Sequence, residues 1–315
     1  NFIDYLSFGI TSFVVALFIK TDIVIGTSPP MPVAFFSVLV AKIKRVKILL
    51  EMRDLWVDSI KELKVTKSKF IINTLYSIEN IMLKNSNKIL CTTESIKNKI
   101  IRRGINKQKI LVRPNGYSDN SLYQNKIKIL IQTKKKYLNI LYFGTIGFAQ
   151  DFNIIFNIAK SFEKKINFFI IGNGSQVDQL INRVKIQKIK NIFVKKVNEK
   201  KLDNSTYKKF DFGLSSLKNC NVFKTVIPSK LYDYASKDLP ILFIGPKGDA
   251  HKLIKKFHLG VCSSPNLFQL KKKLNNMFKN KVKNNNYILK KNKYFKSIFK
   301  RESIAKDILD DIYKK

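Results

Sequence analysis

Histidine and cysteine are scarce in this chain of 315 residues, which has two histidines and three cysteines. The cysteines Cys91, Cys220 and Cys262 lie far apart in apolar surroundings and form no C-x-x-C pair. A disulfide framework is therefore excluded, a structural zinc site is not expected, and the pattern suits a reducing compartment. The sequence also has no Asp-x-Asp motif, so we expect no bound metal and no cofactor.

Acidic residues are scarce as well: 22 Asp and Glu face 60 Lys and Arg, a formal net charge of +38. A surface this basic favours phosphate groups, whether in nucleic acid, anionic lipid or a nucleotide substrate. Lys, Asn and Ile are all abundant, so the bias of an A/T-rich genome is a second explanation for the charge. The lysines are spread along the chain rather than gathered on one helix, and we therefore expect no nucleic-acid partner.

A long apolar run is missing too. The run at residues 5–19, bounded by Asp4 and Lys20, is shorter than the roughly 20 residues that a spanning helix needs. It lacks the positive start and the small-residue cleavage site of a signal peptide. Two interpretations remain, a buried helix and a helix that dips into a membrane surface, and we favour the buried helix.

Apolar strands and amphipathic helices alternate along most of the chain. Continuous apolar strands separated by helices indicate parallel sheets that are covered on both faces, so the predicted class is α/β. The expected strands are 22–26, 46–52, 88–93, 109–113, 138–144, 166–172, 191–195, 211–217, 240–245 and 260–262. The expected helices include 32–43, 69–83, one that Thr93 caps from Glu94, and a final helix at about 295–313.

The strands fall into two blocks separated by the polar, lysine-rich stretch 117–137. We predict two doubly wound, Rossmann-like domains, residues 1–125 and 126–294. The C-terminal helix 295–315 can pack on either domain, including back on the first. In open α/β sheets ligands bind beyond the carboxyl ends of the strands, at helix N-termini. The predicted site is therefore a cleft that the two domains face.

The stretch K-T-V-I-P-S-K-L-Y-D-Y-A at 224–235 concentrates the chemistry. Pro228 pre-sets a helical backbone and Ser229 can serve first-turn N–H groups, which predicts a helix over 229–236. Its N-terminus is an anion site, and Lys230 adds a full charge suited to phosphate. Asp233, one turn on, can accept hydrogen bonds from a sugar diol. Diphosphate plus ribose indicates a nucleotide.

This stretch, followed by P-I at 240–241, resembles the donor-site signature of retaining GT-B glycosyltransferases of family 4, in the branch that builds O-antigen, capsule and colanic acid. L-Y-F-G-T-I-G-F-A-Q-D (141–151) and I-I-G-N-G (170–174) resemble the loops of the family's second domain. Four blocks of the first half follow in the family's order: I-G-T-S-P-P (25–30), E-M-R-D-L-W (51–56), T-E-S (93–95) and R-P-N-G (113–116). The resemblance covers nearly the whole chain but lacks the family's opening strand and glycine-rich loop. We therefore expect an N-terminally truncated member.

The resemblance implies a set of donor-binding residues. Asp233 stands where the family has a ribose-binding Glu, and Thr225 stands at the family's other Glu position. Lys230 and the backbone at 228–230 would neutralise the diphosphate, Gly144 would let the backbone approach it, and the base would lie near Val194 and Lys195. The full set is Gly144, Thr145, Gln150, Gly172, Asn173, Gly174, Val194, Lys195, Thr225, Ile227, Pro228, Ser229, Lys230 and Asp233.

Three residues are predicted to be catalytic: Arg53, Asp54 and Lys230. Arg53 and Asp54 stand where many relatives have a His-Asp pair, and we expect them to contact the donor sugar or the acceptor. Thr145 and Gln150 replace an Arg and a Lys of many relatives, which leaves the phosphate charge mainly to Lys230 and to dipoles. In the mechanism that the resemblance implies, the protein positions reactants and stabilises the leaving group.

The function implied is a bacterial, retaining transfer of a sugar, such as an N-acetylated hexose, from a nucleotide-sugar donor, a UDP-sugar. The acceptor would be a lipid-linked saccharide of surface polysaccharide biosynthesis. The enzyme would be cytoplasmic and peripheral at the inner face of the plasma membrane, held by anionic lipid. The alternatives are an inactive nucleotide-binding fragment, a basic nucleic-acid-binding protein, and a GT-B epimerase, for which the expected histidine and acid set is missing.

Overall fold

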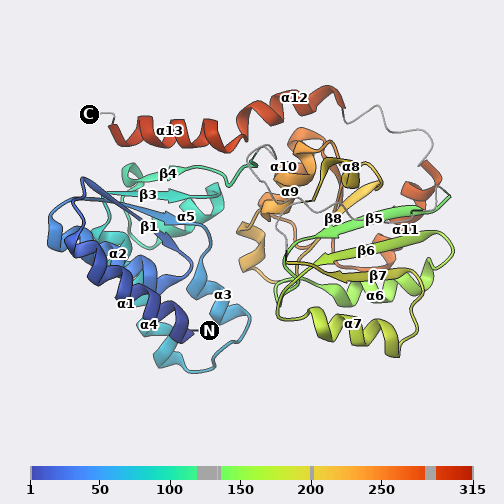
Figure 1. The fold of residues 1–315 in the computed structure, drawn as a ribbon, viewed down its shortest axis with the longest axis horizontal. Coiled ribbons are helices and arrows are strands. Elements are labelled where there is room, and N and C mark those ends of the chain that lie inside the picture. The colour runs from blue at the N-terminus through green and yellow to red at the C-terminus, as the bar shows by residue number, and fades with distance from the viewer. Residues whose placement is uncertain (1, 119–132, 134–135, 199–201, 281–288, 314–315) are drawn as a thin grey trace. The chain divides into compact units, whose positions relative to one another are not determined.

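The structure is a computed structural model that describes residues 2–118, 133, 136–198, 202–280 and 289–313. The chain divides into two compact units, residues 1–115 with 220–227 and residues 116–219 with 228–315. Each unit is a parallel sheet with helices packed against it (Figure 1), which confirms the predicted α/β class. The predicted boundary at 125/126 lies outside the described residues.

The first unit holds a four-stranded sheet in the order β1-β2-β3-β4, with all neighbouring strands parallel. The strands are β1 (Ile23–Ser28), β2 (Lys47–Met52), β3 (Lys88–Cys91) and β4 (Ile110–Val112). The helices are α1 (Phe2–Phe18), α2 (Met31–Lys44), α3 (Trp56–Glu62), α4 (Lys69–Asn85) and α5 (Glu94–Arg102), with short 3-10 turns η1 (Lys107–Lys109) and η3 (Val222–Thr225). All four strands were predicted within a few residues, and the Thr93 hydroxyl caps α5 as expected by accepting from the Ile96 N–H.

The first apolar run forms α1, and the expectation that it is buried is wrong for most of its length. Phe8 is 60% exposed, Val15 58% and Phe18 86%. The helix contacts α2 along one side, where Phe13 packs on Phe36 at a centroid distance of 5.7 Å. Hydropathy alone indicated burial because it counts apolar residues without showing whether a second layer covers them.

A charged cluster is built into the helical layer of the first unit. The Arg103 guanidinium donates to Glu79, whose side chain is fully buried, and to Asp58. Lys99 lies 3.9 Å from the same Asp58 carboxylate. Burial alone would lower the pKa of Arg103, but the two carboxylates raise it. The cluster joins α3, α4 and the end of α5.

The second unit holds a six-stranded parallel sheet in the order β10-β9-β8-β5-β6-β7. The strands are β5 (Leu138–Phe143), β6 (Ile166–Gly172), β7 (Ile192–Lys196), β8 (Phe212–Ser216), β9 (Ile241–Ile244) and β10 (Gly260–Ser263). The helices are α6 (Phe152–Ser161), α7 (Val177–Ile186), α8 (Asn204–Tyr207), α9 (Ser229–Ser236), α10 (Asp249–Phe257), α11 (Leu267–Asn280), α12 (Leu289–Ile298) and α13 (Arg301–Tyr313). The strand order reverses between β5 and β8, which is where open α/β sheets bind ligands.

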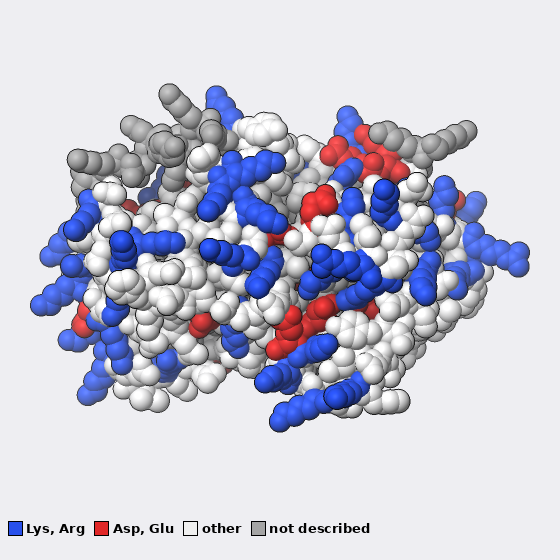
Figure 2. Space-filling model, turned by 180° about the vertical axis from the view of Figure 1, so that it is seen from behind, with Lys and Arg blue, Asp and Glu red and all other residues white. Residues whose placement is uncertain are grey.

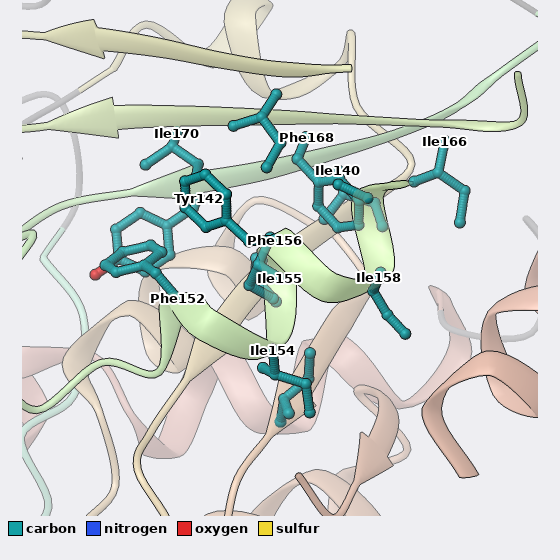
Figure 3. Packing of buried hydrophobic residues seen from close by; sticks show 14 of the residues in the cluster. Ile140, Tyr142, Phe152, Ile154, Ile155, Phe156, Ile158, Ile166, Phe168 and Ile170 are labelled. Carbon is teal, nitrogen blue, oxygen red and sulfur yellow. The ribbon is translucent and has the colours of Figure 1, made fainter. Parts of the chain in front are cut away.

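Helices cover both faces of this sheet. Alternate β5 residues Leu138, Ile140 and Tyr142 point into a core shared with α6, α7 and α11. Figure 3 shows this packing, with Tyr142 beside Phe152 of α6, where the two ring centroids are 5.1 Å apart. Helices α9 and α10 contact β8 and β9. The sheet is therefore buried on both sides, as its continuous apolar strands predicted.

The predicted helix at 295–313 is instead two helices, α12 and α13, separated at Phe299 and Lys300. At the break the Tyr117 N–H donates to the Phe299 carbonyl, and the Arg301 N–H donates to the Tyr117 carbonyl. Phe299 and Phe295 stack on Tyr232 of α9, with centroids 5.3 and 6.1 Å away. Both helices thus belong to the second unit.

Candidate functional site

Two glycine turns meet at the carboxyl edge of the second unit's sheet. A Cβ at Gly172, which ends β6, would lie 1.9 Å from the carbonyl oxygen of Gly144, the residue after β5. No side chain fits there, so only glycine allows the approach. The Gly144 N–H donates to the Ile171 carbonyl at 3.0 Å. The predicted motif glycines therefore form one continuous backbone surface.

The loop that follows Gly144 is braced from several sides. The Ile146 N–H donates to the Asn173 carbonyl at 2.9 Å, and the Tyr142 hydroxyl donates to the Thr145 carbonyl. The Gly147 N–H donates to the side-chain oxygen of Gln150 at 2.8 Å. The Gln150 carboxamide thus shapes the loop, while the Thr145 side chain is exposed. Gly174, also in the predicted set, approaches the Ile146 carbonyl so closely that its Cβ would lie 2.3 Å from that oxygen.

Helix α9 begins where it was predicted, at Ser229, with Pro228 at the N-cap position. No side chain caps it, so the prediction that the Ser229 hydroxyl serves the first-turn N–H groups is wrong. The first-turn N–H groups of a helix point along its axis and have no intrahelical acceptor. In α9 the Leu231 N–H donates to the Pro228 carbonyl at 3.0 Å, so it is the N–H groups of Ser229 and Lys230 that this end of the helix can offer to an external anion.

Lys230 lies in the first turn of α9 with its ammonium buried. Its Nζ lies 3.5 Å from the centroid of the Tyr142 ring and has no hydrogen-bond partner among the described residues. A Cβ built on Gly144 would lie 3.8 Å from the same Nζ. Burial lowers the pKa of Lys230 to about 7, an effect that the charge of Asp233 partly offsets. An unpaired buried cation is costly to a fold, which marks this one as a candidate ligand-binding group.

Asp233 is half-buried and lies three residues after Lys230 on α9, close enough to act electrostatically on its neighbours. Its charge contributes to the raised pKa of the Tyr207 phenol, after burial, and counters the fall in the pKa of Lys230. A carboxylate near an ammonium at a helix start can accept from hydroxyl groups of a ligand while the ammonium meets its negative charge.

The two residues predicted to lie near the base are in the edge strand next to these turns. Val194 and Lys195 lie within β7, where Val194 packs against the core and Lys195 points to solvent. The strand ends at Lys196, and the N–H of the next residue, Val197, donates to the Gly172 carbonyl at 3.1 Å. The Asn173 amide donates to the Asn198 side chain at 2.6 Å. Val197 and Asn198 are thus beside the glycine turns, and counting to the strand's carboxyl end would have found them.

Thr225 and Ile227 belong to the first unit, whereas the other predicted donor-binding residues belong to the second. The Thr225 carbonyl accepts from the Thr93 hydroxyl at 2.9 Å, and the Thr225 hydroxyl donates to Val222 at 2.8 Å. The Val222 N–H in turn donates to Glu62 at 2.9 Å. The buried hydroxyl of Thr225 therefore holds η3 in place.

Arg53 and Asp54 follow β2, at the carboxyl edge of the first unit's sheet. The Arg53 backbone is fixed on both sides, because its N–H donates to Ser28 at 2.9 Å and its carbonyl accepts from the Thr92 hydroxyl at 2.8 Å. The Arg53 side chain is exposed. Burial raises the pKa of Asp54 to about 6, and the Arg53 charge opposes this shift. A carboxyl group held at a strand end with a raised pKa is a candidate functional group.

Comparison with solved structures identifies the fold of the chain. No family model and no curated protein matches the chain. Among solved structures, HepE from Anabaena in complex with UDP and glucose has a TM-score of 0.73 at 11% identity, over 97% of this chain and 81% of that one. The lipopolysaccharide outer core galactosyltransferase WaaB has a TM-score of 0.61 at 15% identity, over 99% and 80%. A glycosyltransferase from Rickettsia africae has a TM-score of 0.66 at 15% identity, over 98% and 81%.

The fold is GT-B. This chain has two parallel-sheet α/β units, of four and six strands as predicted, and its fold is similar to that of these glycosyltransferases. In the part of the chain that the structure describes, no three His, Cys, Asp or Glu residues are grouped so that they could hold a metal ion. Across the same residues, no helix has the length and apolarity to cross a bilayer.

Proposed function

We propose that this GT-B protein is a glycosyltransferase that takes its sugar from a uridine diphosphate donor. The second unit would bind the donor, and Arg53 and Asp54 of the first unit are proposed as catalytic residues. Support comes from the fold shared with glycosyltransferases, one of which, HepE, is described in complex with UDP and with UDP-glucose.

The observation that carries the proposal is the buried, unpaired ammonium of Lys230 beside Gly144. A diphosphate placed against this group would meet a full positive charge, the open N-terminal turn of α9 and the backbone of the glycine turns together. Each of these favours an anion, and an anion would relieve the cost of leaving the ammonium unpaired. Asp233 would then accept from the ribose hydroxyls.

In the transfer, the leaving group is a nucleoside diphosphate whose bridging oxygen gains negative charge as the bond to the sugar breaks. Lys230 and the first-turn N–H groups of α9 would stabilise that charge where it develops. In the proposed transfer no metal ion takes part, and the Lys230 ammonium neutralises the charge of the leaving diphosphate. Asp54 would contact the reacting sugar or the acceptor hydroxyl, and retention of configuration is part of the proposal.

The acceptor we propose is a lipid-linked saccharide of bacterial surface polysaccharide synthesis, with an N-acetylated hexose among the candidate sugars. WaaB, which acts on the lipopolysaccharide outer core, is among the fold neighbours and supports this class. The exposed apolar side chains of α1, with the net charge of +38, would hold the enzyme peripherally at the cytoplasmic face of an anionic membrane. Figure 2 shows lysines and arginines spread across the face in view rather than collected in one patch, and a general attraction to anionic surfaces needs no single patch.

The test is a calorimetric titration of UDP into the wild-type protein and into Lys230→Ala, with ADP and GDP as base controls. We expect saturable UDP binding by the wild type and a loss of at least about tenfold in affinity in Lys230→Ala, since a charge-assisted contact of about 1.5–3 kcal/mol is removed. Lys160→Ala, which changes an exposed lysine of α6, is the matched control and should bind as the wild type does.

Equal UDP affinity in wild type and Lys230→Ala would overturn the assignment of this site. UDP binding combined with no release of UDP from UDP-sugars, with saccharide-lipid acceptors present, would favour the inactive nucleotide-binding alternative. Tight binding to nucleic acid with a steep salt dependence, and no binding of UDP, would favour the nucleic-acid-binding alternative.

A further inference from the structure

Strands β5 and β8 part at their carboxyl ends. They pair only at Ile140 with Phe212 and at Leu141 with Gly213, although β5 continues to Phe143 and β8 to Ser216. Backbone groups beyond the last pair need other partners, because buried N–H and C=O groups are rarely left unpaired. This gap lies where the strand order reverses.

The side chain of Tyr234, 1% exposed, fills the gap. Its hydroxyl accepts from the Phe143 N–H at 2.9 Å. Its single proton can be donated to either of two carbonyls, that of Leu214 at 3.3 Å or that of Leu141 at 3.4 Å. The Tyr234 phenol therefore lies within hydrogen-bond distance of backbone groups of both β5 and β8. The ring lies against Gly213, where a Cβ would be 2.4 Å from a ring carbon, so a side chain at 213 would displace it.

Two consecutive backbone N–H groups at the end of β5 donate to different partners. The Phe143 N–H points to the Tyr234 hydroxyl, and the next N–H, that of Gly144, points to Ile171 on β6. Gly144 is the residue whose backbone lies beside the Lys230 ammonium. The Tyr234 hydroxyl thus fixes one side of the turn that the proposed diphosphate would contact.

Lys230 and Tyr234 are four residues apart on α9, so they lie on the same face of the helix. Tyr234 ties that face to the end of β5, and Lys230, one turn earlier, reaches over Tyr142 of the same strand. Tyr234 is therefore one of the contacts that tie this face of α9 to the end of β5, next to the glycine turn.

Resting on the function proposed above, we infer that Tyr234 is a positioning residue of the donor site: its hydroxyl holds the Phe143–Gly144 backbone and the start of α9 in the spacing that a diphosphate requires. It acts through Gly144 and Lys230 rather than by contact with the ligand. Gly213 is its partner, because the ring needs the space that a side chain would occupy.

The test compares UDP affinity in Tyr234→Phe, Tyr232→Phe and wild type, each well below its unfolding temperature. Tyr232 is equally buried on α9 but stacks on Phe295 and Phe299, so it controls for the loss of a buried phenol. We expect a roughly five- to tenfold weaker UDP affinity in Tyr234→Phe, as for one lost hydrogen bond, and no change in Tyr232→Phe. Wild-type affinity in Tyr234→Phe, or an equal loss in both variants, would overturn the inference while leaving UDP binding by the wild type intact.

Hydrogen exchange in the wild type gives a second measurement that does not depend on a variant folding. UDP should slow exchange of the Phe143 and Gly144 amides by about tenfold or more, because the bound anion would hold the turn that Tyr234 positions. Unchanged exchange at both amides with UDP bound would overturn the inference. Absence of UDP binding in the wild type would instead refute the proposed function on which the inference rests.

Discussion

Each unit of the molecule buries a cation, and the two are treated in opposite ways. In the first unit, Arg103 is held by the carboxylates of Glu79 and Asp58. In the second, Lys230 has an aromatic face under its ammonium but no hydrogen-bond acceptor among the described residues. The guanidinium of Arg103 thus has two carboxylate partners within the protein, although the other Glu79 oxygen, Oε1, has no hydrogen-bond partner among the described residues. For Lys230 the proposed partner is the anion of the donor.

The difference separates a structural charge from a functional one. A buried ion pair leaves the pKa of its cation high, and the pKa of Arg103 is raised. A buried cation without a close partner loses charge, and the pKa of Lys230 falls to about 7. Buried charges without a close partner are found at functional sites, where a bound ligand offsets the unfavourable energy of burial.

The largest effect expected from this comparison is on stability in the first unit. Arg103→Met would leave the Glu79 carboxylate buried and unpaired, and we expect a loss of about 3–5 kcal/mol in the free energy of unfolding. Urea denaturation measures it. Arg102→Met, the exposed neighbour, is the control and should change stability by less than about 0.5 kcal/mol. Similar results for the two variants would show that the cluster is not structural.

The next effect is on the pH dependence of UDP affinity. In the free protein the pKa of Lys230 is about 7, and a bound diphosphate would raise it. Above about pH 7 the ammonium must therefore gain a proton on binding, so affinity should fall by up to about tenfold per pH unit between about pH 7.5 and 9. Titrations in that range, where UDP is already ionised, would show the slope. A flat profile would contradict the role of Lys230.

A smaller effect distinguishes the two cations directly. Lys230→Met removes an unpaired buried charge and keeps a side chain of similar length, so its unfolding temperature should equal or exceed that of the wild type. Arg103→Met should lower it. Differential scanning calorimetry on both, with Lys160→Met as the surface control, makes the comparison. A fall for Lys230→Met as large as for Arg103→Met would mean that Lys230 is structural.

The smallest effect concerns Asp54. Burial raises its pKa from 3.8 to about 6, so the folded protein binds more protons than the unfolded one between those values, and stability falls as pH rises through that window. Asp54→Asn should therefore stabilise the protein slightly at about pH 7.5, with the gain shrinking below about pH 5. Thermal melts across this range check it against exposed Asp22→Asn. A variant less stable at every pH would refute the raised pKa.

The sequence predicted what depends on local pattern. The parallel strands followed from continuous apolar runs, and α9 followed from Pro228 and the spacing after it. Contacts between residues far apart in the chain could not be predicted from the sequence. The contact of Thr93 with Thr225 joins residues 132 positions apart, and nothing near Thr225 in the chain indicates that this segment packs on the first unit.

The residues of the candidate site were named from the sequence and remain a prediction, whereas their surroundings could only come from the structure. Lys230 and the glycine turns came from the motif, yet the absence of a partner for the ammonium depends on what surrounds it in space. The contacts of Tyr234 could not be predicted from the sequence, because only the sheet register shows that β5 and β8 separate beside it. The exposure of α1 and the break between α12 and α13 likewise depend on packing rather than on hydropathy.

The central claim is that Lys230 lacks a partner until a diphosphate provides one. Calorimetry of UDP binding at about pH 8, repeated in buffers of different ionisation enthalpy, counts the protons exchanged. The account predicts net proton uptake by the wild type and none by any residual binding to Lys230→Met. Binding without proton uptake in the wild type, or the same uptake in both proteins, would contradict it.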